Sequence, residues 1–155
     1  MQLASSVFRG IAAPGLVFLL LTLGAFPSRA DEATDAKNVT TAFFRFTDRN
    51  DAEGAYSLAG EQLRRTAPKR ETMAGLQTWF ATKGGSASSH EIIAQRAISE
   101  DEARAMYPQA TAKGNVYVFR YRSKYPKAVF FEDIYVSRDS DGVLRINGHV
   151  PQPAE

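Results

Sequence analysis

The chain of 155 residues contains no cysteine and only two histidines. Without cysteine it can form no disulfide, and it has no thiol for nucleophilic catalysis, lipid attachment or zinc binding. His90 and His149 are far apart in the sequence, and no histidine and carboxylate residues have the spacing of metal ligands. The sequence therefore predicts no metal and no cofactor.

Residues 31–155 also lack an excess of charge of either sign. Residues 1–30 contain Arg9 and Arg29 and no acid, so the remaining chain has as many basic as acidic side chains. In the segment "YVFRYRSKY", basic and aromatic residues alternate, which places them on opposite faces of a strand. Single-stranded nucleic acids are bound by cations and rings on one face, so we expect no nucleic-acid partner.

Long apolar runs are absent except for Leu16–Leu23 near the N-terminus. A basic residue precedes this run, and small residues follow it at Ser28 and Ala30, a pattern typical of a secretory signal peptide. The alternative is an uncleaved membrane anchor, but a spanning helix needs about 20 apolar residues. We therefore predict a signal peptide at 1–30, a periplasmic or secreted protein, and no stable membrane span after cleavage.

Residues 31–155 are predicted to form one domain, with a core at about 38–150. Apolar residues at helical spacing predict three helices, from Asp35 to Asp48, from Asn50 or Asp51 through Leu63, and from Pro68 to Lys83. Residues rich in β-branched and aromatic types then predict four strands, at His90–Ser99, Asn115–Tyr125, Ala128–Arg138 and Val143–Val150. This order is typical of an α+β fold with helices on an antiparallel sheet.

The faces of this sheet depend on strand register, and we predict that Ser123 pairs with Val129. The inner face then carries Asp133 among aromatic rings. We also predict that Arg138 pairs with Val143, so that Ile146 and Val150 face inward and His149 faces outward. A carboxylate among rings would have a raised pKa, so Asp133 is the candidate catalytic residue, with a nearby tyrosine as hydrogen-bond donor. The predicted pocket-lining residues, from helices and sheet together, are Phe43, Tyr56, Trp79, Tyr117, Phe119, Tyr121, Phe131 and Tyr135.

The outer face is predicted to keep an apolar strip beside charged residues, formed by Val116, Val118, Ile134 and Val136. Such a strip is typical of an interface, so we expect a homodimer or another envelope protein as partner.

The helical segment "FFRFTDRNDAEGAYSLAG" and the strand segment "YVFRYRSKYPKAVFFEDIYVSRDSDGVLRINGHV" resemble the nuclear transport factor two-like superfamily of α+β cones. More narrowly, they resemble secreted Gram-negative domains of unknown function, family 4019 of such domains. The resemblance covers most of residues 38–150, although Leu144 stands where such families often have tryptophan. It implies three N-terminal helices on a curved, cystatin-like antiparallel sheet enclosing a pocket, and it implies no activity.

Three functions are compatible with this pattern. The first is a periplasmic, non-catalytic binding or interaction module with a pocket for a small apolar or amphipathic ligand. The second is a cofactor-free isomerase, dehydratase or hydrolase that uses Asp133 with a tyrosine. The third is an envelope assembly component that docks through the outer face of the sheet. The sequence leaves open whether the protein is an enzyme.

Overall fold

The computed structural model describes residues 29–106 and 112–154, so the predicted signal peptide lies almost entirely outside it. Within these residues the helices are α1 (Arg29–Asp48), α2 (Ala52–Ser57), α3 (Glu61–Thr66), α4 (Lys69–Lys83) and α5 (Glu100–Met106). The strands are β1 (Ser89–Ile98), β2 (Lys113–Lys124), β3 (Val129–Arg138) and β4 (Leu144–Pro153). They form an antiparallel sheet in the order β1-β2-β3-β4, which confirms the predicted α+β class.

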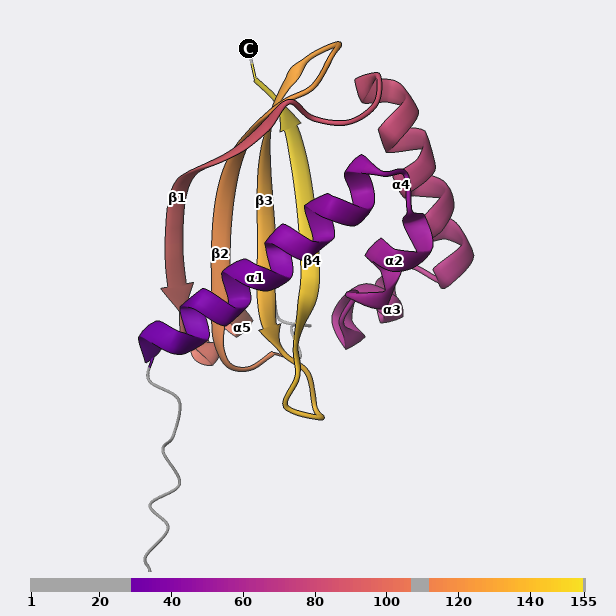
Figure 1. Cartoon of the computed structure of the whole chain (residues 1–155). Coiled ribbons are helices and arrows are strands. Elements are labelled where there is room, and N and C mark those ends of the chain that lie inside the picture. The colour runs from indigo at the N-terminus through magenta and orange to yellow at the C-terminus, as the bar shows by residue number, and fades with distance from the viewer. Residues whose placement is uncertain (1–28, 107–111, 155) are drawn as a thin grey trace, which may run out of the picture.

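Helices cover both faces of this sheet, but unequally. Helix α1 crosses one face diagonally, and α2 to α4 lie beside it near β4 (Figure 1). Phe43 and Phe44 of α1 pack in the main core with Tyr117, Phe119 and other inward side chains of the sheet. The alternate residues of β2 face the other way, where Val116 and Val118 pack with Ala103 of α5.

The second predicted helix is interrupted between α2 and α3. Asp51 caps α2 as expected, accepting a 2.8 Å hydrogen bond from the Gly54 nitrogen. The chain then leaves the helix to bond with β4, where Gly60 N donates to the Ile146 oxygen at 2.7 Å and Ile146 N donates to the Leu58 oxygen at 2.9 Å. These backbone bonds to the sheet replace the helical bonds that a continuous helix would make.

The predicted pairing of β2 with β3 is wrong by one residue. Lys124, and not Ser123, pairs with Val129, because the hairpin closes at Tyr125 and Ala128 around a two-residue turn. Pro126 occupies the first position of this turn, where its fixed φ is favourable. Since a slip of one residue exchanges the faces of a strand, Glu132 faces inward and Asp133 faces outward.

A second difference lies in the pairing of β3 with β4, where Arg138 pairs with Leu144 and not with Val143. The pairing of β3 with β4 shifts between Tyr135 and Val136, so that an extra residue of β4, Asn147, is accommodated as a bulge. Ile146 before this irregularity is buried, as predicted, but the faces are exchanged after it. His149 therefore faces inward, while Val150, predicted to face inward, is 44% exposed.

With these registers, the four residues of the predicted apolar strip do not lie together on the outer face. Ile134 and Val136 belong to the main core and have no exposed surface. Val116 and Val118 do lie on the outer face, but they pack with Ala103 of α5 and with Ile98, and both are less than 10% exposed. These four side chains are therefore core residues of two separate clusters and cannot form one exposed interface.

Candidate functional site

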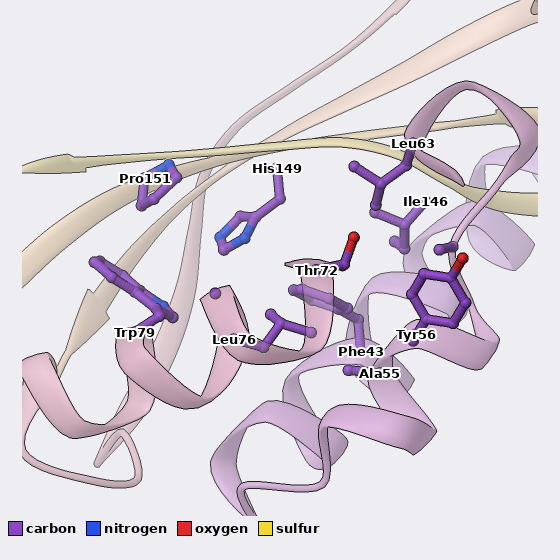
Figure 2. A pocket seen from close by; sticks show the side chains of 12 residues that line it. Phe43, Ala55, Tyr56, Leu63, Thr72, Leu76, Trp79, Ile146, His149 and Pro151 are labelled. Carbon is purple, nitrogen blue, oxygen red and sulfur yellow. The ribbon is translucent and has the colours of Figure 1, made fainter. Parts of the chain in front are cut away.

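A cavity of about 240 Å³ lies between the helices α1 to α4 and the strand β4. Figure 2 shows its wall, which is largely apolar. The lining residues are Phe43, Ala55, Tyr56, Ala59, Leu63, Thr72, Gly75, Leu76, Trp79, Ile146, His149 and Pro151. Three of the predicted pocket residues, Phe43, Tyr56 and Trp79, are among them.

The other predicted pocket residues lie elsewhere. Tyr117 and Phe119 are buried in the main core, and Tyr121 lines a second cavity described below. Phe131 and Tyr135 project from the opposite face of β3, because they alternate with the inward residues Glu132 and Ile134. The pocket is thus made mainly by helices and β4, and not by the aromatic residues of β2 and β3.

A glycine in the middle of α4 is part of the cavity wall. Gly75 lines the cavity, and a Cβ atom added to it would meet no other atom within 4 Å. The residue is exposed, so a small side chain at this position would find open space. Glycine in a helix interior costs about 0.5–1 kcal/mol relative to alanine, so a methyl group at this open position should stabilise α4.

His149 is the main ionisable group in the cavity wall. Its ring projects from β4 toward α4, into the space shared by Trp79, Leu76 and Phe43 (Figure 2). The ring makes edge contacts with Phe43 and Trp79, with centroids 5.2 Å and 6.4 Å apart. An imidazole held among rings in this way has few alternative orientations.

Behind His149 lies a buried carboxylate. Glu132 is 1% exposed, and its Oε2 is 2.7 Å from Nε2 of His149. Its Oε1 accepts a 2.6 Å hydrogen bond from the hydroxyl of Tyr125. Burial raises the pKa of Glu132. The hydrogen bond and charge of His149, with further hydrogen bonds from Ser123 and Tyr125, outweigh burial and lower that pKa to about 2. Glu132 is therefore an ionised acceptor inside the protein.

The other histidine is held on both of its ring nitrogens. Nδ1 of His90 is 2.7 Å from Oγ of Ser123, and Nε2 is 3.0 Å from Oδ2 of Asp48. Its ring stacks on Phe44, with centroids 3.7 Å apart. Because Ser123 also bonds Glu132, polar side chains from α1 and all four strands form one chain, Asp48–His90–Ser123–Glu132–His149.

Lys83, the last residue of α4, lies beside this chain. It is 1% exposed, and its Nζ has no hydrogen-bond partner among the described residues. The ammonium lies 3.9 Å from the ring centroid of Tyr125 and 5.7 Å from that of Trp79. Burial lowers the pKa of Lys83, while the negative charges of Glu132 and Asp48 act in the opposite direction.

At the other end of the polar chain, a second cavity of about 390 Å³ lies between α1 and the strands β1 and β2. Its apolar floor includes Phe44 and Tyr121, and His90 and Asp48 form its polar end. Lys37 and Arg45 on the exposed side of α1 complete the wall. Both nitrogens of His90 are already occupied, so this cavity contains no free imidazole.

Asp133, the predicted catalytic residue, lines neither cavity. It pairs with Arg120 through two hydrogen bonds of 2.7 Å and 2.6 Å on the outer face of the sheet. Arg120 is about half exposed, so the pair is in contact with solvent. The prediction was wrong about its surroundings because either register places an acid opposite Arg120, and charge pairing could not distinguish Glu132 from Asp133.

Within residues 29–106 and 112–154, no group of three or more histidine or carboxylate side chains is placed to hold a metal ion. No helix in the same residues is long and apolar enough to cross a membrane. Comparison of the chain with protein-family models, curated proteins and solved structures gives no match in any of the three. The function must therefore be inferred from the cavity and its side chains.

Proposed function

We propose that the protein binds a small, mainly apolar molecule in the cavity beside α4. The observation that carries this proposal is a largely apolar wall that includes the imidazole of His149, with the side chains of Tyr56 and Thr72 as the other polar groups. Ligand pockets commonly combine apolar lining with a few polar groups that orient the ligand. The cavity is smaller than most pockets for drug-sized ligands, so we expect a molecule of about one or two rings with one polar group near His149.

This proposal includes the cellular location and the finer fold. We propose that residues 1–30 direct the protein to the periplasm or the exterior and that residues 31–155 form the mature domain. The resemblance to the cone superfamily is part of the same proposal, supported by helices that enclose a cavity against one face of an antiparallel sheet. The ligand would then be a molecule of the cell envelope or the medium.

Binding can be measured with the protein's own fluorescence. Trp79 is the single tryptophan of the chain and lines the cavity, so a nitroaromatic molecule bound there should quench its emission. We suggest 4-nitrotoluene and 4-nitrobenzyl alcohol, two neutral molecules that differ by one hydroxyl group. Saturable quenching by both is expected, with the alcohol binding several-fold more tightly because it can bond to His149.

Two substitutions at one position provide the matched test. Gly75→Leu should fill the cavity and weaken binding of both molecules at least tenfold, whereas Gly75→Ala adds only one methyl group and should retain binding. Thermal unfolding would show that both variants are folded. Quenching that does not saturate, or equal binding by the leucine variant, would show that the cavity is not a ligand site.

A further inference from the structure

We infer that His149 is a general base, positioned by Glu132, that removes a proton from carbon in a small molecule bound in the cavity. This inference rests on the proposed binding function and adds a reaction to it. It places the chemistry at Glu132 and His149, and not at Asp133, whose carboxylate is paired with Arg120 on the other face of the sheet.

The hydrogen bond to Glu132 determines which ring nitrogen is available. An ionised carboxylate only accepts hydrogen bonds, so Nε2 of His149 must carry the proton in the 2.7 Å contact. In the neutral ring, the lone pair is then on Nδ1, which makes no hydrogen bond with the described residues. The ring that bears this nitrogen lines the cavity (Figure 2).

The geometry also provides a partner for the cation that proton transfer to this ring would form. When His149 accepts a second proton it becomes a cation, and the carboxylate of Glu132 stabilises that cation at hydrogen-bond distance. Tyr125 holds the second oxygen of Glu132, and Ser123 supports it from β2, so the carboxylate is fixed. Lys83 on α4 contributes a positive charge that acts on Glu132 from the side of Tyr125.

His90 shows why the two histidines differ in function. Both of its nitrogens are engaged, one by Ser123 and one by Asp48, so it has no lone pair available for a ligand. In His149, Nε2 bonds Glu132, whereas Nδ1 makes no hydrogen bond with the described residues. The buried polar chain thus ends in a single imidazole that can exchange a proton with a bound molecule.

The reaction requires no other reagent. Nδ1 takes a proton from a carbon that is acidic because it adjoins a carbonyl group or lies in an electron-poor ring. The electron pair of the broken C–H bond moves to the carbonyl oxygen, or it expels a leaving atom from the neighbouring position. The proton then returns to another carbon of the molecule or passes to water, and His149 is neutral again.

The test is the base-catalysed opening of 5-nitrobenzisoxazole, an aromatic molecule with one acidic C–H bond. Removal of that proton breaks the ring N–O bond and releases a yellow phenolate, so the atoms balance without a cofactor. The wild-type protein should show saturable turnover at least 100-fold faster than an equal concentration of free imidazole, within the range of general-base catalysis. His149→Gln and His149→Phe should both lose this excess.

Glu132 is tested separately as a positioning residue. Glu132→Gln should lower kcat at least tenfold with KM nearly unchanged, and it should shift the pH dependence of kcat, because an amide does not stabilise the histidine cation. Glu132→Asp, which keeps the charge, should restore part of the rate. Asp133→Asn is the matched control, since it removes the neighbouring carboxylate, and it should leave the rate unchanged.

The outcomes separate the two proposals. If 4-nitrotoluene quenches Trp79 but turnover does not exceed that of free imidazole, the cavity binds ligands and the general-base inference is wrong. If turnover persists in both His149 variants, the inference is also wrong, whatever the fate of the Glu132 variants. If neither nitroaromatic molecule quenches Trp79, the binding proposal is wrong. Circular dichroism of each variant shows whether a lost rate reflects unfolding.

Discussion

Glu132→Gln should change the acid stability of the protein more than any other carboxylate substitution on the sheet. Glu132 is fully enclosed, and its carboxylate is bonded to His149 and Tyr125. In the unfolded chain the same carboxylate is in water with its ordinary pKa of 4.5. The folded protein therefore holds this proton less tightly than the unfolded chain does, because the pKa in the fold is lowered to about 2.

The sign and size of the effect follow from this difference. A carboxylate with a lowered pKa in the folded state contributes stability above its unfolded pKa, and that stability is lost as the pH falls through the folded value. The fall of the Glu132 pKa from 4.5 to about 2 corresponds to about 3 kcal/mol of folding stability, at about 1.36 kcal/mol per unit of pKa. The loss should occur between about pH 4.5 and pH 2.

The assay is urea unfolding of the wild type and Glu132→Gln at several pH values from about pH 6 to pH 2. The wild type should be more stable than Glu132→Gln at about pH 6. The difference between their free energies of unfolding should shrink by about 3 kcal/mol as the pH falls to about 2. Asp141→Asn is a useful control, because the low pKa of Asp141 comes from its exposed pair with Arg145 and salt should screen it. Parallel curves for the wild type and Glu132→Gln, at low and high salt, would refute the assignment of Glu132 as a buried ionised acceptor.

Three further predictions concern other parts of the chain. Asp133→Asn should cost no more than about 1 kcal/mol in urea unfolding, because its partner Arg120 is about half exposed. Gly75→Ala should raise the free energy of unfolding by about 0.5–1 kcal/mol, since the added methyl group meets no atom and alanine favours the helix. Intact mass of protein recovered from the periplasm should show cleavage after Ala30, and retention of residues 1–30 would contradict the predicted signal peptide.

The sequence predicted the elements of the fold well because their signals are local. The change from helical spacing to β-branched and aromatic segments lies near Gly84, which ends α4 in the left-handed conformation. The four strands begin and end within a few residues of their predicted limits. The break between α2 and α3 was missed because it depends on hydrogen bonds to Ile146 in β4, far along the chain.

The candidate site was harder to predict because it depends on register. Two acidic residues, Glu132 and Asp133, are adjacent on β3, so alternation alone places one of them inside. Whether Pro126 lies in a two-residue or a three-residue loop decides which one, and both loops pair Arg120 with an acid. The bulge at Asn147, which turns His149 inward, has no clear signal in the sequence. Gly75 was a usable signal, since a glycine amid a helical pattern often marks close packing or a space.

Lys83 gives a last prediction, which tests the electrostatics of the buried chain. Desolvation is the largest influence on the pKa of Lys83 and lowers it. Burial therefore destabilises the charged amine more than the negative charges of Glu132 and Asp48 stabilise it. Lys83→Met keeps most of the side-chain volume and removes both the charge and the unpaired Nζ.

We therefore expect Lys83→Met to be more stable than the wild type at neutral pH, as has been found when buried charges are replaced by apolar groups of similar size. The advantage should diminish as the pH rises from the lowered pKa of Lys83 toward 10.5, because the wild type then folds with a neutral amine. Thermal unfolding from pH 7 to about pH 10 measures this trend. A variant that is less stable at every pH would show that the attraction of Lys83 to Glu132 exceeds its cost of burial.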